Sequence, residues 1–275
     1  MTVAEAIRAA AERLLKTSDT ARLDAELLMA HALGVSRSDM LLRHQTDAAP
    51  AAFEPLVDRR TAHEPIAHIT GEQEFYGRPF AVTRDTLIPR GDSEVLIETA
   101  LECAPNAERV LDLGTGSGAL LVTALLELEG ATGIGTDASG RALDVAQRNA
   151  QDLGLIGAQA RFLLRDWTRT GWADDLGTFD LVLCNPPYVE TSAALDAQVR
   201  DYEPESALFA GAEGLDDYRV IFPQLRKLLN REGIAIFEIG HEQGAKVSEI
   251  AQMHGFTTEI RADLAKRPRL VICRP

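Results

Sequence analysis

The chain has 275 residues, of which 45% are hydrophobic and 25% are charged, an ordinary globular composition that argues against disorder. It contains no run of about 18 apolar residues, and its N-terminus lacks the features of a signal peptide, so we expect a cytoplasmic protein that spans no membrane. The formal net charge of −14 disfavours a DNA or RNA substrate, because proteins that bind a phosphate backbone usually carry a basic face. An acidic protein fits better with a positively charged partner.

Cysteine and histidine residues are few and scattered. Cys103, Cys184 and Cys273 lie far apart, and no Cys/Cys or Cys/His ligand spacing occurs, so the sequence predicts neither a disulfide framework nor a metal site. His63 and His68 share a segment, but no third ligand accompanies them. We expect both to be structural or surface groups.

Residues 1–71 predict a small N-terminal helical domain. Thr2 and Glu5 have the spacing of a capping box at the start of an Ala/Leu-rich helix. The next helix should end at Gly34, which suits a helix C-terminus. We expect the later helices of this domain over residues 20–33, 38–44 and 50–63. The domain is either a packing appendage or a docking platform for a macromolecule, and the sequence does not decide between them.

Residues 72–90 change character. Aromatic and β-branched residues surround Gly77 and Pro79, which predicts a β-hairpin linker. Residues 91–275 form the third segment, in which strands and helices alternate. We expect strands at residues 109–113, 132–136, 159–164, 179–184, 233–239, 257–260 and 270–273. We expect helices at residues 92–102, with Asp92 as N-cap, and at 119–128, 138–153, 217–229 and 242–254. Repeated βα units predict an α/β fold with a mostly parallel seven-stranded sheet and helices on both faces.

A glycine-rich turn, DLGTGSG, occupies residues 112–118 between the first of these strands and a helix. Glycines there let the backbone approach a ligand at the carboxyl edge of the sheet. The pattern is G-x-G-x-G rather than the G-x-G-x-x-G of dinucleotide-binding enzymes. A dinucleotide-binding loop and a simple tight turn nevertheless remain alternative interpretations of this segment. The segment resembles the cofactor loop of the Rossmann-like methyltransferases, which surrounds the methionine part of S-adenosylmethionine. The resemblance implies cofactor contacts from Gly114, Thr115, Gly116, Ser117 and Gly118.

Three more residues suit an adenosine. Asp137 ends the second strand, 23 residues after Gly114, where a carboxylate can accept both ribose hydroxyls in an NAD or an S-adenosylmethionine enzyme. It could instead cap the following helix. In the fold that the chain resembles, Asp166 and Trp167 flank the adenine. Trp167 would then provide an aromatic surface and Asp166 an acceptor for the exocyclic amine, whereas a lone tryptophan after a strand usually packs in the core.

The tetrad Asn185-Pro186-Pro187-Tyr188 follows the apolar strand sequence LVLC. Its two prolines remove two N–H donors and stiffen the chain. The Asn185 amide then projects into the cofactor cleft with the Pro186 carbonyl beside it, so that two oxygens can accept hydrogen bonds from one NH₂ group while Tyr188 stacks on the planar group that carries it. At this place in a methyltransferase-like domain, the tetrad indicates an enzyme that acts on an exocyclic or amide nitrogen.

An amide nitrogen is a poor nucleophile because its lone pair is delocalised. Two acceptors on its hydrogens would hold it in place and increase its electron density, so positioning and electrostatics should provide most of the rate. A strong general base is not required, since the nitrogen becomes acidic as it is methylated. The sequence shows no Ser-His-Asp or Cys-His arrangement that would indicate a covalent intermediate.

Nearly the whole chain resembles the bacterial release-factor glutamine N5-methyltransferases, which methylate the glutamine of the Gly-Gly-Gln tripeptide in class-1 release factors. The resemblance rests on HITG at residues 68–71, EFY at 74–76, LIPR at 87–90, the loop at 114–118, the tetrad at 185–188, YEP at 202–204 and EIG at 238–240. It implies a class I methyltransferase fold behind a small helical domain, S-adenosylmethionine as cofactor, and a release factor as protein substrate without direct nucleic-acid binding. We expect a monomer, because a large partner must reach the cleft.

The family resemblance also implies roles for individual residues. It places cofactor contacts at Gly114–Gly118, Asp137, Asp166, Trp167 and Asn185. It places the substrate on Asn185, Pro186, Pro187 and Tyr188, with Asn185, Pro186 and Tyr188 as the catalytic groups. Arg90 and Glu203 match recurrent family positions and are assigned to shaping the glutamine pocket, although an ion pair that only closes the fold is an equal alternative.

The sequence departs from the family pattern at two places. Gly91 stands where the family usually has proline, and residues 263–267 lack a glycine that the family often has there.

Three rival functions are alternatives to this interpretation. A DNA adenine or ribosomal RNA guanine N-methyltransferase would share the tetrad but should show a basic groove. An NAD-dependent oxidoreductase would leave the tetrad unexplained. A noncatalytic adaptor for release factors would need neither the cofactor loop nor the tetrad.

Overall fold

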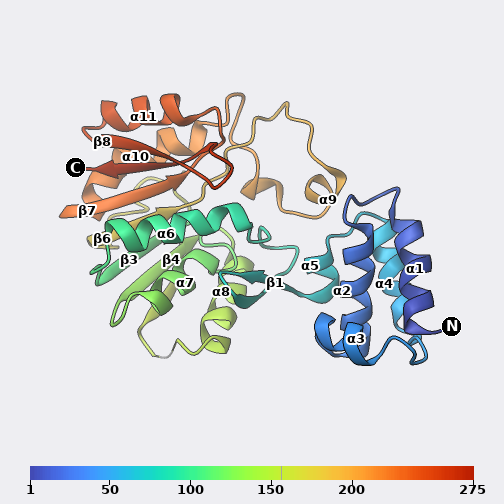
Figure 1. Ribbon diagram of the computed structural model, residues 1–275. Coiled ribbons are helices and arrows are strands. Elements are labelled where there is room, and N and C mark those ends of the chain that lie inside the picture. The colour runs from blue at the N-terminus through green and yellow to red at the C-terminus, as the bar shows by residue number, and fades with distance from the viewer. Residues whose placement is uncertain (156) are drawn as a thin grey trace. The chain divides into compact units, whose positions relative to one another are not determined.

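The computed structural model describes residues 1–155 and 157–275, which divide into two compact units. The first unit comprises residues 1–72 together with residues 195–202, and the second comprises residues 73–194 and 203–275 (Figure 1). Residues 195–202, which follow the tetrad, belong to the first unit, although nothing in the sequence marks this. None of the helices in the described part of the chain has the length and apolar content of a membrane-crossing segment.

The first unit is helical. It contains α1 (Val3–Leu14), α2 (Ala21–Leu33), α3 (Arg37–Arg43), α4 (Phe53–Thr61), α5 (Ile66–Thr70) and α9 (Ala197–Arg200). Its capping box is confirmed, since the Thr2 side chain accepts from the Glu5 amide at 3.3 Å and the Glu5 carboxylate accepts from the Thr2 amide at 2.8 Å. Gly34 ends α2 in the left-handed conformation, as expected. The short helix α5 was not predicted, because five residues are too few to show a helical period.

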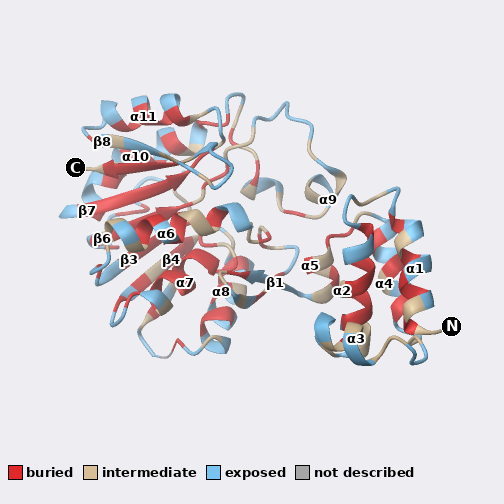
Figure 2. Ribbon diagram, in the orientation of Figure 1, coloured by how far each residue is buried: buried red, intermediate tan, exposed pale blue. Residues whose placement is uncertain are grey.

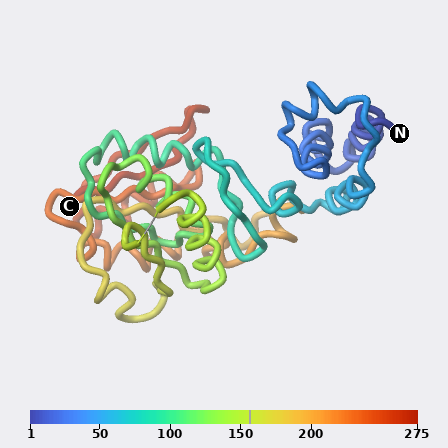
Figure 3. Tube along the Cα trace, turned by 90° about the horizontal axis from the view of Figure 1, so that it is seen from below, coloured from blue at the N-terminus to red at the C-terminus, as the bar shows by residue number. Residues whose placement is uncertain are grey.

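Apolar faces of these helices form one core. α1 and α2 lie side by side in both views (Figures 1 and 3), with Ile7 of α1 and Leu28 of α2 buried in that core. A buried ion pair joins Arg60 of α4 to Asp24 of α2 at 2.7 Å. The Arg60 guanidinium also donates to Gln198 at 3.3 Å, which ties α9 to the rest of this unit.

A two-stranded sheet, β1 (Glu72–Phe75) and β2 (Arg78–Ala81), follows the helices. Tyr76 and Gly77, the two residues between the strands, have φ angles of 52° and 70°. A type I′ turn requires positive φ at both central residues, so the tight hairpin predicted around Gly77 is confirmed. Phe75 and Phe80 then pack edge to face, with ring centroids 6.1 Å apart.

The second unit is built on a seven-stranded sheet of order β5-β4-β3-β6-β7-β9-β8. Its strands are β3 (Arg109–Leu113), β4 (Thr132–Asp137), β5 (Ala160–Leu164), β6 (Phe179–Cys184), β7 (Leu229–Glu238), β8 (Thr257–Ala262) and β9 (Pro268–Arg274). The first five pair in parallel, whereas β9 runs antiparallel to β7 and β8 antiparallel to β9. The predicted seven-stranded, mostly parallel sheet is therefore confirmed.

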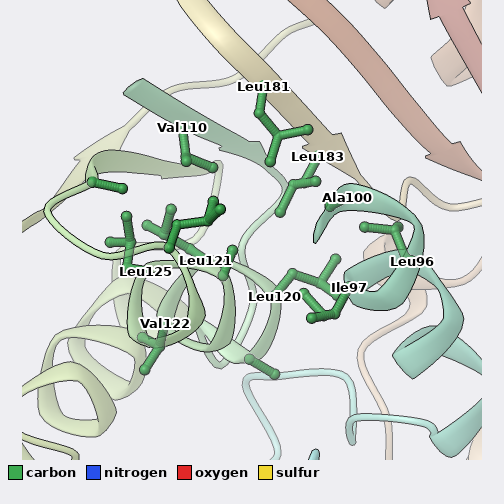
Figure 4. Packing of buried hydrophobic residues seen from close by; sticks show 14 of the residues in the cluster. Leu96, Ile97, Ala100, Val110, Leu120, Leu121, Val122, Leu125, Leu181 and Leu183 are labelled. Atoms are coloured by element: carbon green, nitrogen blue, oxygen red, sulfur yellow. The ribbon is translucent and has the colours of Figure 1, made fainter. Parts of the chain in front are cut away.

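Helices cover both faces of this sheet. They are α6 (Glu94–Cys103), preceded by the 3₁₀ turn η1 (Gly91–Ser93), and α7 (Ala119–Glu127), α8 (Gly140–Asp152), α10 (Asp216–Leu228) and α11 (Gly244–Met253), with a second 3₁₀ turn, η2 (Glu205–Ala207), before α10. Alternation along β6 sends Leu181 and Leu183 to the core under α6 and α7, and Val182 to the core under α10 and α11. Figure 4 shows the first of these cores, and Figure 2 shows the central strands buried between helices with exposed outer faces.

One expected helix cap is wrong, and the alternative role of Asp137 as a cap is not observed. Asp92 does not cap α6, because η1 precedes that helix and the Asp92 carboxylate instead pairs with Arg269 of β9 at 3.1 Å. Asp137 does not cap α8 either. That role falls to Ser139, whose hydroxyl accepts from the Ala142 amide at 3.2 Å. The Asp137 carboxylate thus remains available at the end of β4.

Candidate active site

A cavity of about 550 Å³ opens in the second unit at the carboxyl ends of the parallel strands. The loops after β3, β4, β5 and β6 all reach it, because parallel strands end at the same edge of a sheet. From the sequence-predicted site, the described residues that line it are Arg90, Gly114, Thr115, Gly116, Ser117, Asp137, Asp166, Trp167, Asn185 and Pro187. The structure therefore brings together segments that are more than 90 residues apart in sequence.

The glycine-rich loop forms one wall of the cavity. Gly114, Gly116 and Gly118 have φ angles of 72°, 54° and 82°, which L-residues with a Cβ rarely adopt. A Cβ on Gly114 would lie 3.0 Å from the Trp167 ring, so the tryptophan packs directly on this backbone. Gly118 does not itself line the cavity among the described residues. It is the N-cap of α7 and packs close to Ala146 of α8.

Asp112 supports this loop from the core. Its side chain is fully buried, and its Oδ2 accepts a hydrogen bond from the Thr115 hydroxyl at 2.6 Å. Burial raises the pKa of Asp112 to about 7, and the Thr115 hydrogen bond opposes part of that rise. The other oxygen, Oδ1, has no hydrogen-bond partner in the described part of the chain.

The Asp137 side chain also contacts this loop. Its Oδ2 accepts from the Gly116 amide at 2.9 Å and its Oδ1 from the Ser139 amide at 2.8 Å. Burial raises the pKa of Asp137, whereas the Ser139 and Gly116 amides lower it. Each carboxylate oxygen keeps further acceptor capacity, which is what recognition of two adjacent hydroxyls requires.

Trp167 is held by a residue that the sequence analysis missed. Its indole Nε1 donates to Asp217 of α10 at 2.5 Å, and Asp217 also lines the cavity. The neighbouring Asp166 accepts from the amide and the hydroxyl of Thr168 at 3.0 and 2.6 Å, and these bonds lower its pKa. Much of its acceptor capacity is thus used locally, and its proposed contact with an adenine amine stays a prediction.

The tetrad is divided between the cavity and the wall behind it. Asn185 and Pro187 line the cavity, whereas Pro186 and Tyr188 are not among the described residues that do so. The Asn185 Nδ2 donates to the Ser93 hydroxyl at 3.4 Å. The Tyr188 hydroxyl donates to Glu238 Oε1 at 3.2 Å, and burial raises the pKa of Tyr188 well above its usual value. Tyr188 is therefore a hydrogen-bond donor and not a base.

Arg90 and Glu203 form an ion pair. The Glu203 side chain is only 1% exposed, and its Oε2 also accepts from the Ile88 amide at 3.1 Å. Glu203 thus holds the LIPR segment, while Arg90 reaches the cavity and stays 40% exposed. This geometry gives the pair a structural role and leaves the Arg90 guanidinium partly free to meet a ligand.

Comparison with known proteins identifies the family. A model of the PrmC N-terminal domain matches residues 5–71, and a methyltransferase-domain model matches residues 105–260. The release factor glutamine methyltransferase of Cereibacter sphaeroides is 42% identical to the chain, over 100% of this chain and 99% of that protein. The chain belongs to the release factor glutamine methyltransferase family. The Rhodospirillum rubrum member is 38% identical over 92% of this chain and 78% of its own length.

Solved structures agree on the fold of this methyltransferase. The hMettl16 catalytic domain in complex with the MAT2A 3′UTR hairpin 6 matches with a TM-score of 0.58 and 15% identity, over 79% of this chain and 82% of that one. A methyltransferase from Pyrococcus furiosus matches with a TM-score of 0.53 and 15% identity, over 72% and 89%. At such low identity these likenesses establish the class I methyltransferase fold alone.

The cofactor of this methyltransferase is S-adenosylmethionine, and the residues present fit it. Gly114 and Gly116, whose φ angles are positive, present no Cβ to the cavity, and the Asp137 carboxylate, which lines it, has unused acceptor capacity. A cavity of about 550 Å³ lies in the range that encloses a ligand of this size. The described residues contain no cluster of three or more His, Cys, Asp or Glu side chains that could hold a metal ion.

Sequence reasoning missed several residues of the site. Asp217 and Ser93 line the cavity, and Asn149 of α8 holds its loop by donating to the Ser117 carbonyl at 2.8 Å. Asn149 also exchanges two hydrogen bonds with Ala81 of β2, at 2.8 and 3.0 Å. The available signal for Asn149 was the occurrence of an asparagine on the apolar face of a helix. Nothing in the sequence marks Ser93 or Asp217.

Proposed function

We propose that this enzyme transfers the methyl group of S-adenosylmethionine to the N5 amide nitrogen of the glutamine in the Gly-Gly-Gln motif of peptide-chain release factors, and so acts in translation termination. One observation supports this most: the Asn185 amide lies in the same cavity as the glycine-rich loop and Asp137. An amide acceptor is thereby held next to the place where a methyl donor would bind. The full-length similarity to release factor glutamine methyltransferases supports the choice of nitrogen.

In this proposal the cofactor is held by residues at three strand ends, those of β3, β4 and β5. The loop Gly114–Gly118 would surround the methionine part, Asp137 would accept the ribose hydroxyls, and Trp167 with Asp166 would flank the adenine. The cofactor supplies an electrophilic methyl group on a sulfonium. Trp167 suits its role, because the hydrogen bond to Asp217 fixes the ring against Gly114.

The substrate glutamine would be held by the tetrad. Asn185 Oδ1 and the Pro186 carbonyl accept hydrogen bonds from the glutamine NH₂, while Pro187 and Tyr188 pack near the amide plane. Because Asn185 Nδ2 faces Ser93, the oxygen Oδ1 is the atom left for the substrate. The buried Tyr188 hydroxyl is anchored to Glu238, so the ring can only assist by position. Arg90 would help to shape the pocket from its ion pair with Glu203.

Transfer is then a direct displacement. The bond from carbon to sulfur would break as the bond from nitrogen to carbon forms, the sulfur would leave as a neutral thioether, and the amide nitrogen would lose one proton to water. Two acceptors on the NH₂ favour this step by placing partial negative charge beside hydrogens that become acidic. Placement of the nitrogen in line with the methyl group provides the rest of the rate.

The proposal includes the setting in which the enzyme works. We place it in the cytoplasm as a monomer of three segments, residues 1–71, 72–90 and 91–275, that binds no nucleic acid directly. The net charge of −14 supports a protein substrate over DNA or ribosomal RNA. The RNA hairpin bound to the hMettl16 domain does not favour a nucleic-acid substrate here, since that likeness concerns the fold alone.

Methyl transfer from radiolabelled S-adenosylmethionine to purified release factor tests the proposal. A Gly-Gly-Ala variant of the factor and duplex DNA serve as comparison substrates. Label on the normal factor, and on neither comparison, is the expected result. Label on DNA, or equal label on the Gly-Gly-Ala variant, would show that the nitrogen had been assigned wrongly.

A further inference from the structure

The main chain of the tetrad has few hydrogen-bonding groups that can hold it in place. Proline has no N–H, so the main chain at Pro186 and Pro187 can be bonded through carbonyls alone. The chain after the tetrad also leaves the second unit, because residues 195–202 belong to the first unit and the second resumes at residue 203. The position of the tetrad therefore depends on bonds from residues that are distant in sequence.

A short parallel bridge joins the chain on either side of residues 195–202. The Val189 amide donates to the Leu208 carbonyl, and the Ala210 amide donates to the Val189 carbonyl, both at 2.9 Å. Leu208 and Ala210 follow η2, whose residues Ser206 and Ala207 line the cavity. The bridge thus connects the end of the tetrad to another part of the cavity wall.

The Gln243 side chain bonds to both of the bridged segments. Its Nε2 donates to the Tyr188 carbonyl at 3.0 Å and to the Gly214 carbonyl at 3.1 Å, and the Glu213 carbonyl lies at 3.4 Å. Tyr188 is the last residue of the tetrad, and Gly214 comes four residues after Ala210. Gln243 therefore fastens the tetrad to the segment that continues from the cavity wall.

The direction of the Gln243 amide follows from its partners. Its Oε1 accepts from the Gly240 amide at 2.9 Å. A main-chain N–H can only donate and a carbonyl can only accept, so all partners are satisfied when the oxygen faces Gly240 and the NH₂ faces the carbonyls. In the opposite rotamer the oxygen would face the carbonyl oxygens of Tyr188 and Gly214. Gln243 and Gly240 both lie between β7 and α11, so the amide is held by its own segment.

Close packing surrounds this amide. Gly214 has φ of +66°, and a Cβ there would overlap the Tyr188 carbonyl oxygen and lie 2.6 Å from Gln243 Nε2. A Cβ on Gly240 would lie 2.9 Å from Gln243 Oε1. The Tyr188 carbonyl is thus in direct contact with the main chain at Gly214. The hydroxyl end of Tyr188 is held separately, since it donates to Glu238 at 3.2 Å.

We propose that Gln243 is a positioning residue that holds the tetrad against the cavity wall at residues 204–207 in the arrangement that methyl transfer requires. It is not among the described residues that line the cavity, so it acts through the Tyr188 carbonyl. Two prolines separate Tyr188 from Asn185, and their fixed φ angles transmit the constraint to the Asn185 amide. This inference rests on the proposed function of the same site and adds a residue that neither the tetrad nor the glycine-rich loop contains.

Methylation of release factor by variants of the full-length enzyme tests this role. Gln243→Glu keeps the shape and the bond from Gly240, but it turns an oxygen toward the carbonyls in place of the NH₂. We expect kcat to fall about 100-fold, because a displacement of about 1 Å in a site can cost that much, with KM for release factor and the cofactor Kd changed by less than about threefold. Gln243→Ala removes the bonds without adding repulsion and should lower kcat about 10-fold.

Gln252→Glu is the matched control for the change of charge. Gln252 lies on α11, the helix that follows Gln243, and its Nε2 donates to the Thr258 hydroxyl at 3.0 Å. A glutamate at this position can accept from that hydroxyl instead. We therefore expect Gln252→Glu to keep kcat within about twofold of wild type.

Gly214→Ala presses on the same carbonyl from the neighbouring segment. It should lower kcat at least about 10-fold, because its methyl group displaces the Tyr188 carbonyl. Gly255→Ala is the control, since Gly255 follows α11 with φ of +84° and a Cβ there would meet nothing within 4 Å. Both variants share the cost of a left-handed alanine, but Gly255→Ala should keep a wild-type kcat.

The outcomes separate this inference from the proposed function. Absence of label on the release factor with the wild-type enzyme would overturn both. Normal transfer by the wild type, together with a wild-type kcat in Gln243→Glu, would overturn the positioning role alone. An equal loss of kcat in Gln252→Glu, or a loss in Gln243→Glu that is matched by weaker cofactor binding, would do the same. If Gln243→Glu does not fold, Gln243→Ala decides, since a wild-type kcat in that variant also contradicts the inference.

Discussion

The contact between Gly114 and Trp167 gives the sharpest quantitative prediction. A Cβ at Gly114 would lie 3.0 Å from Trp167 Cη2 and 3.2 Å from Cζ3, and the residue has φ of +72°. Gly114→Ala therefore has two separate effects. The left-handed backbone penalises an alanine by about 1 kcal/mol, and the methyl group pushes the indole outward by a few tenths of an ångström.

The indole cannot move freely, because its Nε1 is bonded to Asp217 at 2.5 Å. Displacement of the ring should thus weaken that bond and misplace the surface proposed to flank the adenine. We expect the cofactor Kd to rise about tenfold, which corresponds to about 1.4 kcal/mol. The loss in the free energy of unfolding should be about 1 kcal/mol, or a fall in Tm of about 2–4 °C.

Gly130→Ala is the matched control. Gly130 has φ of +79°, and a Cβ there would meet nothing within 4 Å. It lies between α7 and β4, outside the described residues that line the cavity. This variant should show the same loss of Tm with an unchanged Kd. Calorimetric titration with S-adenosylmethionine measures the difference, and a wild-type Kd in Gly114→Ala would refute the reasoning.

Three further predictions follow from the structure. Burial raises the pKa of Asp112 from 3.8 to about 7, so between these pH values the cofactor-free fold keeps a proton that the unfolded chain releases. The free energy of unfolding should therefore decline as pH rises from about 4 to about 7. Urea unfolding of Asp112→Asn should show a smaller decline over the same pH range. Arg60→Ala leaves Asp24 buried without its charged partner and should cost about 3–5 kcal/mol in urea unfolding, whereas Arg13→Ala, on an exposed ion pair, should cost less than about 1 kcal/mol. Equal losses would contradict that distinction. Asn185→Ala should reduce kcat for release-factor methylation by about 10²–10³-fold and leave the cofactor Kd within a few fold, and wild-type turnover in that variant would refute its assignment as an acceptor.

Local sequence patterns were sufficient for most of the secondary structure. The capping box at Thr2, the glycine end of α2 and the alternation along β6 each depend on neighbours within a few residues. The order of strands, glycine loop and tetrad also predicted which segments would share the site, because carboxyl ends of parallel strands must meet at one edge.

One expectation proved wrong because the side chain has a distant alternative partner. Asp92 had the position of a helix cap, but Arg269 from β9 offers it an opposite charge at 3.1 Å. The substrate contacts of Pro186 and Tyr188 stay predictions, because the described lining of the cavity includes their neighbours Asn185 and Pro187 but not these two residues. A motif specifies which residue types are present and not which of their faces the core will cover.

By itself, the sequence determined the helical N-terminal unit, the alternating fold and the identity of the cofactor loop and tetrad, because these depend on short-range periodicity and turn chemistry. Only the tertiary structure decided that Asp217 would anchor Trp167, that Asn149 would clamp the glycine loop, and that Glu238 would lie behind the tetrad. These contacts join residues 32 to 50 positions apart in the chain. The physical reason is burial, since a polar side chain acquires its partner only when the folded sheet removes both from water.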